Sequence, residues 1–282
     1  MFFDSHVHSM ASPDSHMCPK EAITTLKNKG LGIAFTEHVD FSENNNNKDP
    51  NASDAIRGLG DFVCDFSIYP RKYEALRGPG VTLGLECGLT KAFLRENIKV
   101  ANSFDYDFII GSIHSVDGVE LYKASKRPEF YLNEPYAQQL HNPATVDECI
   151  SRYLTYSREM VEQSNFFHAF GHIDYITRYA PGVKERFLYE NFASEFDALL
   201  KILTERQIAL EINTSRFSDD IGGEIFILCK RFAALGGRLC TIGSDAHSVE
   251  NLGKSVKHAK RIASEAGLLP VYFKERKPIP CG

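Results

Sequence analysis

The chain begins and ends with groups of residues that typically bind metal ions. The first group, D-S-H-V-H, spans residues 4–8, and the last, G-S-D-A-H, spans residues 243–247. Two histidines separated by one residue on a β-strand point to the same side, so His6 and His8 can hold one ion. Imidazole and carboxylate groups are common ligands of divalent metals. These two segments therefore predict a metal centre.

The chain has ten histidines, and six of them stand at or just past the end of an apolar run that is typical of a β-strand. These six are His6, His8, His38, His114, His172 and His247. A single histidine at a strand end is usually structural, but six such placements are improbable by chance. Glu86 and Asp245 end strands in the same way, and a buried carboxylate is costly unless it is paired or coordinated. We therefore expect most of these side chains to bind metal.

Three more carboxylates lie next to the candidate ligands in sequence. Asp4 precedes His6 by two residues and faces the same side of the strand, so it is either a ligand or an acceptor that fixes an imidazole. We favour the second role for Asp4. Glu37 and Asp40 flank His38, and we expect them to support the ligands or the structure rather than to bind metal.

The segments that must position these residues alternate between strand and helix patterns. Strands are expected at residues 2–8, 32–38, 81–89, 107–115, 167–173, 208–213 and 238–243, and most are followed by a helical pattern, the longest at 184–206. Repeated strand–helix units predict a parallel sheet that is buried on both faces. Because polar residues follow nearly every strand, we expect a closed α/β barrel, a distorted TIM-like (β/α)7 barrel, rather than an open sheet.

Length and composition are consistent with this fold class. A chain of 282 residues suits one barrel domain over residues 1–282, with loop excursions near 42–58 and 117–143. The net charge of −5 gives no general attraction to nucleic acid. No apolar run is long enough to cross a membrane, and the N-terminus has no basic leader, so we expect a cytoplasmic protein.

The ordered motifs resemble those of the PHP (polymerase and histidinol phosphatase) superfamily. Besides the two terminal motifs, they are T-E-H at 36–38, G-x-E at 84–86, G-S-I-H at 111–114 and G-H-x-D at 171–174. Within the superfamily, the chain is similar to the monofunctional histidinol-phosphate phosphatases. That similarity is carried by S-P-D-S at 12–15, F-x-x-x-G-H-x-D at 167–174, E-I-N-T at 211–214 and Y-F-K-E-R-K-P at 272–278. The resemblance covers essentially the whole chain.

The resemblance implies a PHP fold with two or three divalent metal ions, of zinc, iron or manganese. It implies three groups of ligands: His6, His8, Glu86 and Asp245 in the first; Glu86, His114 and His172 in the second; and Asp14, His38 and His247 in the third. His16 is an alternative to Asp14. Glu86, which would bridge two ions, is predicted to be catalytic together with Asp245 and His247.

The implied reaction is hydrolysis of a small phosphomonoester, with L-histidinol phosphate of histidine biosynthesis as the favoured substrate. Divalent ions acidify water and bind phosphoryl oxygens. Arg178 and Arg216 follow strands, and a guanidinium matches the geometry of phosphate, so we expect both to bind the phosphate. The alternative for each arginine is a surface ion pair.

Other features of the substrate and its partners are less defined. The substrate amine needs an acceptor, for which Glu43, Asp49 and Glu120 are candidates, and His141 could also reach the substrate. Two alternatives stay open: a PHP phosphoesterase acting on nucleotides or other small phosphoesters, and a non-catalytic PHP module. We expect a small-molecule phosphate ester as partner, with no nucleic acid and no membrane, and the sequence does not indicate an oligomeric state.

Overall fold

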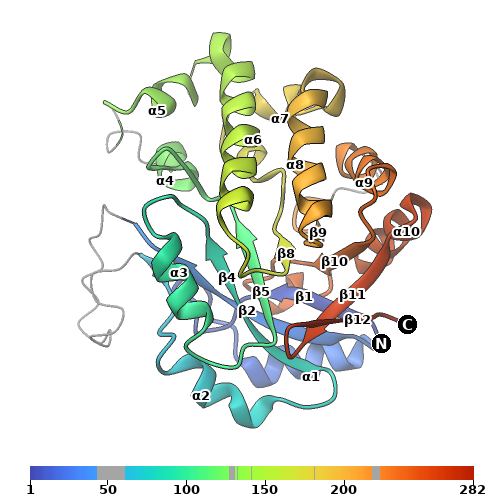
Figure 1. The fold of residues 1–282 in the computed structure, drawn as a ribbon. Coiled ribbons are helices and arrows are strands. Elements are labelled where there is room, and N and C mark those ends of the chain that lie inside the picture. The colour runs from blue at the N-terminus through green and yellow to red at the C-terminus, as the bar shows by residue number, and fades with distance from the viewer. Residues whose placement is uncertain (43–60, 127–130, 132, 141, 181, 218–222) are drawn as a thin grey trace.

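The structure is a computed structural model that describes residues 1–42, 61–126, 131, 133–140, 142–180, 182–217 and 223–282. Its main sheet follows the spatial order β1 (Phe3–Val7), β2 (Gly32–Asp40), β4 (Val81–Gly88), β5 (Phe108–Ser112), β8 (Ala169–Phe170), β9 (Ala209–Asn213), β10 (Leu239–Gly243), β11 (Leu269–Lys274) and β12 (Lys277–Pro280) (Figure 1). Neighbours from β1 to β11 pair in parallel, and β12 returns antiparallel. The seven expected strands are all present, and the parallel α/β class is confirmed.

The first strand and the last expected strand meet at their carboxyl ends. Asp245 donates its backbone N–H to the carbonyl of His6 at 2.8 Å, and His8 donates to the carbonyl of Ala246 at 3.0 Å. At its amino end, β10 pairs with β11 instead. At the end that carries the candidate ligands, β1 and β10 are therefore joined by a short seam of two backbone hydrogen bonds rather than by a full ladder. At the other end, the additional strand β11 takes the place beside β10.

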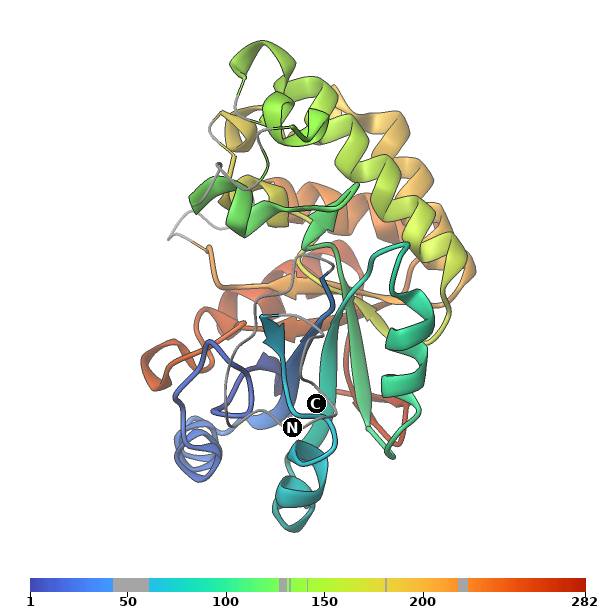
Figure 2. The same cartoon turned by 90° about the vertical axis from the view of Figure 1, so that its left-hand side faces the viewer.

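Amphipathic helices cover the outside of the sheet (Figures 1 and 2). They are α1 (Pro19–Asn28), α2 (Tyr69–Tyr73), α3 (Leu94–Ala101), α6 (Val146–Gln163), α8 (Ala193–Glu205), α9 (Glu224–Ala234) and α10 (Val256–Ala266). In α8, the residues Phe196, Leu199, Leu200 and Leu203 recur every three or four positions, and all four are fully buried. This spacing places them on one face of the helix, which packs against α6 and the sheet.

Some expected elements differ from those observed. The single helix expected over 184–206 is divided into α7 (Val183–Arg186) and α8, because the backbone of Tyr189 turns away to donate a hydrogen bond to Glu224 of α9. The stretch 117–143 was expected to be an irregular loop, but it contains α4 (Leu121–Lys126) and α5 (Pro135–Leu140). Two short hairpin elements, β6 (Ser115–Val116) and β7 (Val119–Glu120), precede α4. Residues 43–58 of the other excursion lie outside the described residues.

A small hydrophobic cluster fills the barrel at the amino ends of the strands. Its members are Ala34, Phe108, Ile110, Ala169, Ala209, Val271 and Phe273. The rings of Phe108 and Phe273 stack with their centroids 5.0 Å apart, and His168 lies against Phe273. Alanines on three strands leave the room that these rings occupy. The C-terminal hairpin of β11 and β12 therefore closes one end of the barrel, so that the other end is left for polar side chains.

Candidate metal centre

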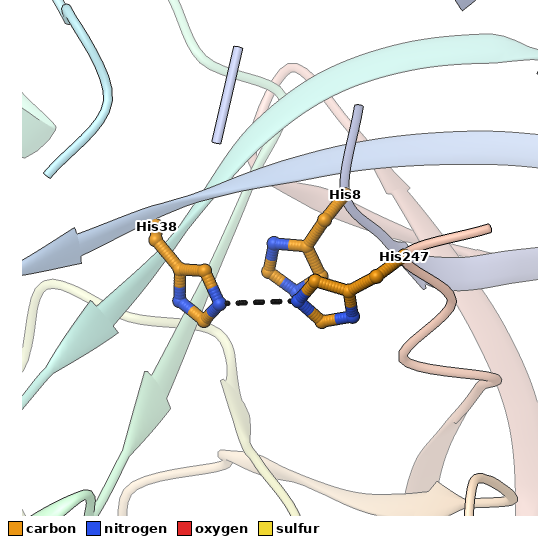
Figure 3. Close-up of side chains that lie close together, drawn as sticks. All are labelled: His8, His38 and His247. Carbon is orange, nitrogen blue, oxygen red and sulfur yellow. Dashed lines mark hydrogen bonds between the residues drawn. The ribbon is translucent and has the colours of Figure 1, made fainter. Parts of the chain in front are cut away.

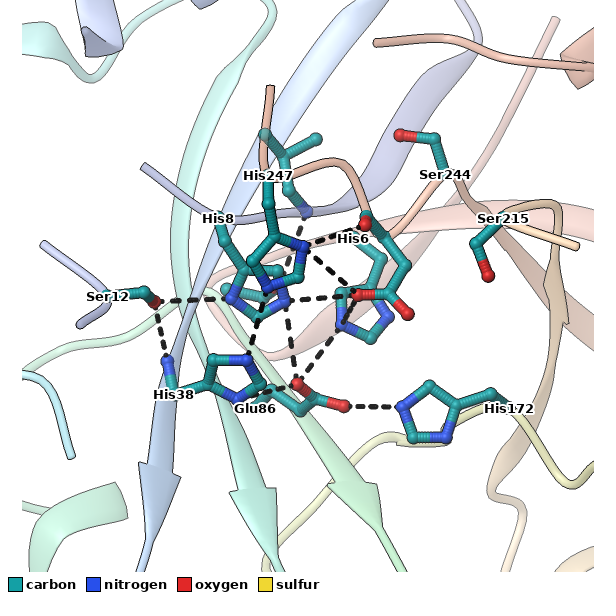
Figure 4. Close-up of polar contacts among 12 residues, drawn as sticks. His6, His8, Ser12, His38, Glu86, His172, Ser215, Ser244 and His247 are labelled. Atoms are coloured by element: carbon teal, nitrogen blue, oxygen red, sulfur yellow. Dashed lines mark hydrogen bonds and ion pairs between the residues drawn. The ribbon is translucent and has the colours of Figure 1, made fainter. Parts of the chain in front are cut away.

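All nine candidate ligands lie together at the carboxyl ends of the parallel strands, and Figure 4 labels His6, His8, His38, Glu86, His172 and His247 among them. His6 lies in β1 and His8 directly follows it, while His38 and Glu86 lie in β2 and β4. The remaining ligands come from the segments that follow β1, β5, β8 and β10: Asp14, His114, His172, Asp245 and His247. Parallel strands bring their carboxyl ends to one side, which explains how residues from the whole chain converge.

The first group has the spacing of a metal site. The Nε2 atoms of His6 and His8 lie 3.3 and 3.5 Å from Oε2 of Glu86. The same two nitrogens lie 3.7 and 3.5 Å from Oδ1 of Asp245. Tetrahedral ligands about 2.0–2.1 Å from an ion lie about 3.4 Å from one another. One divalent ion therefore fits among these four side chains.

The second group uses the other oxygen of the same carboxylate. Oε1 of Glu86 lies 2.7 Å from Nε2 of His172 and 3.3 Å from Nε2 of His114. The two imidazole nitrogens are 3.4 Å apart. Because Oε2 faces the first group and Oε1 faces the second, the carboxylate of Glu86 has the geometry of a bridge between two ions.

The third group lies beside the first (Figure 3). Nε2 of His38 and Nε2 of His247 are 3.4 Å apart, and Oδ2 of Asp14 lies 3.4 and 3.1 Å from them. The sequence left Asp14 and His16 as alternatives at this position. The structure brings the carboxylate of Asp14 to the two imidazoles, although both Asp14 and His16 are exposed.

Several buried polar atoms of the cluster have no hydrogen-bond partner, and they indicate whether these residues suit an ion. Nε2 of His6, Nε2 of His8 and Oε2 of Glu86 are such atoms, and all three point into the first group. An unsatisfied buried polar group costs about 1–3 kcal/mol. A cation bound among them would satisfy all three atoms at once, so the residues fit a divalent metal.

The charges of the cluster lead to the same conclusion. Burial alone would raise the pKa of Glu86, but the imidazoles of His6 and His114 hold it well below its ordinary value. Burial lowers the pKa of His6, but Glu211 and Glu86 raise it well above its ordinary value. For His114, burial lowers the pKa, whereas Asp40 and Glu86 raise it, to about 10. The carboxylates therefore stabilise positive charge in the cluster. Protonated imidazoles supply this charge when no ion is bound.

Several candidate ligands are held by outer hydrogen bonds. Nδ1 of His114 lies 3.0 Å from both carboxylate oxygens of Asp40. Nδ1 of His8 lies 3.2 Å from Oγ of Ser12, which donates to Glu37 at 2.6 Å. These contacts have the geometry of the supporting role predicted for Asp40 and Glu37, although Asp40 also forms a possible metal-binding group with His38 and His114. Such contacts fix the tautomer of an imidazole and leave its other nitrogen free for a metal.

Two acidic residues have roles that the sequence did not give. Asp4 was expected to hold an imidazole, but it accepts hydrogen bonds from the backbone N–H and hydroxyl of Ser244 at 2.8 and 2.6 Å, and from Gly253. Asp4 thereby fixes the loop that carries Asp245. The acceptor for Nδ1 of His6 is instead Glu211, at 2.6 Å. In the sequence, Glu211 is the first residue of the E-I-N-T motif at 211–214, but no role was predicted for it.

The two arginines predicted to bind phosphate differ in their surroundings. Arg178 is largely buried, with 9% of its side chain exposed, and donates to Asp245 at 2.9 Å, Ser215 at 3.0 Å and Asn213 at 3.3 Å. Arg216 is exposed and, with Arg178, lines a cavity of about 410 Å³. In this structure, Arg178 therefore orients the carboxylate of Asp245, and Arg216 is the more accessible of the two guanidinium groups.

A second cavity of about 190 Å³ opens directly onto the ligand cluster. It is lined by Asp14, His38, Asp40, Phe62, His114, Glu120, Tyr122, Tyr175 and Tyr179. Burial raises the pKa of Glu120, against the effect of its ion pair with Lys123 at 2.7 Å. This cavity combines aromatic walls with a buried carboxylate. Glu43, Asp49 and His141, the other residues predicted to reach the substrate, lie outside the described residues.

Comparisons with known proteins identify the family of the chain. The family model for the PHP domain matches residues 4–215. The chain is 30% identical to a probable histidinol-phosphatase from Clostridium acetobutylicum, with 98% of each chain covered. It is 28% identical to the histidinol-phosphatase of Lactococcus lactis, with 94% of this chain and 91% of the relative covered.

A solved structure is similar along nearly the whole chain. It is the histidinol phosphate phosphatase of Lactococcus lactis in complex with zinc, L-histidinol and phosphate. The two structures have a TM-score of 0.81 at 26% identity, and the match covers 99% of this chain and 98% of the other. Among the described residues, no helix has the length and apolar character that a membrane span requires.

Proposed function

The chain belongs to the PHP domain family, and from this premise we propose that it is a metal-dependent phosphomonoesterase that hydrolyses L-histidinol phosphate to L-histidinol and phosphate. The observation that carries this proposal is the ligand cluster, in which one buried carboxylate, Glu86, faces imidazoles on both of its oxygens. Full-length similarity to histidinol-phosphatases supports the choice of substrate.

We assign three ions to the three groups, with Glu86 shared by the first and second. The first ion would be held by His6, His8, Glu86 and Asp245, the second by Glu86, His114 and His172, and the third by Asp14, His38 and His247. Zinc, iron and manganese all suit imidazole and carboxylate ligands. The zinc in the related Lactococcus structure makes zinc our first choice.

The residues around the cluster suggest how the substrate is held. Ions bound there would acidify water and neutralise the charge on the phosphoryl group. We assign Arg216, which is exposed and lines the 410 Å³ cavity, to the phosphate oxygens, and we assign Arg178 to holding Asp245 in position. We assign the alcohol part of the substrate to the 190 Å³ cavity, where Glu120 can accept a hydrogen bond from the amine and tyrosine rings can pack against the imidazole.

Phosphate release from a panel of substrates tests the proposal. The purified protein would be reconstituted separately with zinc, manganese and iron, and assayed with L-histidinol phosphate, nucleoside monophosphates and sugar phosphates. We expect the highest kcat/KM with L-histidinol phosphate. Faster turnover of nucleotides would replace this proposal with a general PHP phosphoesterase, and no turnover of any ester would indicate a non-catalytic module.

A further inference from the structure

We propose that Glu211 is a positioning residue that joins the first and second ligand groups, so that ion binding at both depends on its two carboxylate oxygens. The inference rests on the metal sites proposed above. Glu211 lies in β9, is 1% exposed, and contacts one ligand of each group. It is not itself among the side chains assigned to an ion.

The two oxygens of Glu211 contact different ligand groups. Oε1 lies 2.6 Å from Nδ1 of His6, a ligand of the first group. Oε2 accepts the backbone N–H of His172, a ligand of the second group, at 2.6 Å. Oε2 also accepts a hydrogen bond from the side chain of Asn213 at 3.2 Å. One side chain thus fixes a ring in the first group and the main chain in the second.

Both contacts require an acceptor. If Nε2 of His6 binds an ion through its lone pair, Nδ1 must carry the proton and donate it. The backbone N–H of His172 is always a donor. A carboxylate offers acceptors on both sides, whereas the amide of glutamine, which has the same shape, offers an oxygen on one side and a donor on the other. Glutamine at this position must therefore place its own N–H donor against a second donor at one of the two groups. At the other group it leaves an amide oxygen that carries no full charge and accepts a weaker hydrogen bond.

The packing around Glu211 leaves little freedom for rearrangement. A Cβ atom at Gly243 would lie 2.6 Å from Oε1 of Glu211 and 2.3 Å from Cβ of His6. Real Cβ atoms essentially never come this close to other atoms, so only glycine at this point of β10 permits the contact. The strands β1, β9 and β10 thus hold the ring of His6 and the carboxylate against each other.

Asp40, another carboxylate that supports the candidate ligands, contacts the second group through His114 and the third group through His38, whose Nδ1 lies 3.5 Å from its Oδ2, but it does not contact the first group. Asp40 directs both of its oxygens to Nδ1 of His114. The two carboxylates therefore predict different patterns of loss. Glu211→Gln should weaken the first and second ions, whereas Asp40→Asn should weaken the second and spare the first.

Titration of the metal-free protein with Co²⁺ tests this difference without relying on activity. Competition with a chelator gives each affinity, and the visible absorption of Co²⁺ reports the coordination of each ion. We expect Glu211→Gln to bind two of the ions 10- to 100-fold more weakly, the range found when such supporting residues are replaced. The matched control is Asp107→Asn, because Asp107 is a buried carboxylate that accepts from Leu83 and Glu275 away from the cluster. The control should lower Tm and leave every Co²⁺ affinity unchanged.

The proposal is overturned if folded Glu211→Gln binds all ions as tightly as the wild-type protein. It is also overturned if Asp107→Asn weakens Co²⁺ binding to the same extent, because the effect would then be general destabilisation. A wild-type protein that binds no Co²⁺ would instead refute the metal sites themselves.

A measurement on the wild-type protein covers the case in which Glu211→Gln does not fold. With ¹⁵N-labelled histidine and bound zinc, the proton of His6 should reside on Nδ1, with the His6 signal assigned from a His6→Asn variant. A proton on Nε2 of His6 would overturn the proposal, because Glu211 would then not determine the tautomer that binds the ion.

Discussion

Replacing Glu86 with glutamine should remove ions while leaving the fold intact. Glu86 lies near the carboxyl end of β4, is fully buried, and is the only one of the assigned ligands that is shared between two groups. Its Oε2 faces His6 and His8, and its Oε1 faces His114 and His172. Glutamine keeps the size of the side chain but can present its oxygen to only one of the two groups.

The expected loss can be worked out from the number of ligands. Binding of a structural zinc by four protein ligands contributes about 10–16 kcal/mol. An equal share for each ligand is about 2.5–4 kcal/mol, which corresponds to a roughly 10²- to 10³-fold weaker affinity at the group that loses its oxygen. The bridging role predicts that the other group is also weakened, because an amide oxygen carries no full charge.

The assay compares the metal content of wild-type and Glu86→Gln protein by elemental analysis after gel filtration, together with kcat for L-histidinol phosphate. We expect the variant to lose at least one ion and most of its activity, with the circular dichroism spectrum of the wild type. Asp107→Asn is again the control for loss of a buried carboxylate. Wild-type metal content with full activity in Glu86→Gln would refute the assignment of Glu86 as a bridge.

Three further predictions concern the ions, the phosphate and the dependence on pH. The purified protein should carry at least two divalent ions per chain, and chelation should abolish activity; fewer than one ion with activity intact after chelation would contradict this. Arg216→Ala should lower kcat/KM roughly tenfold to a hundredfold, the loss of a charge-assisted hydrogen bond of about 1.5–3 kcal/mol, with metal content unchanged; an unchanged kcat/KM would exclude phosphate binding by Arg216. Burial, followed by the charge of Arg276, lowers the pKa of His168 from 6.5 to about 4. Between these two pH values the unfolded chain binds a proton at His168 and the folded protein does not. The free energy of unfolding is therefore highest above pH 6.5 and decreases as the pH falls toward 4. Urea unfolding of chelator-treated protein should show that the free energy of unfolding falls by about 3 kcal/mol between pH 6.5 and pH 4 in the wild type, and by less in His168→Asn. Equal decreases in the two proteins would assign the acid sensitivity to other groups.

The sequence predicted the positions of the parallel strands and the ligands that follow them, because both depend on local patterns. An imidazole or carboxylate at the end of an apolar run is visible in a short window, and parallel strands bring such ends together. The partner of His6 was not predictable in this way, because Glu211 lies 205 residues further along the chain and reads locally as one charge in a buried strand. Asp4 illustrates the same limit, since its partners Ser244 and Gly253 come from the other end of the chain.

The interrupted helix has a different physical origin. The apolar spacing over 184–206 suits one long helix, and α8 retains that spacing. The break near Tyr189 is accompanied by a contact with Glu224 of α9. The spacing of apolar residues within one helix cannot predict such a tertiary contact. The C-terminal hairpin was also missed, and its Phe273 is needed to fill the barrel beside Phe108. Tertiary contacts decided each of these elements.

With the first ion at its proposed position, the seam between β1 and β10 would make closure of the barrel sensitive to metal. His6 and His8 stand on one side of the seam and Asp245 on the other, and the two backbone hydrogen bonds that join them involve these same residues. Opening the seam must therefore release the first ion. A free ion concentration 1,000 times its dissociation constant would add about 4 kcal/mol to the cost of opening. Amide hydrogen exchange at His8 and Asp245 should consequently slow with metal concentration, while the amides between β4 and β5 keep a rate set by the fold alone.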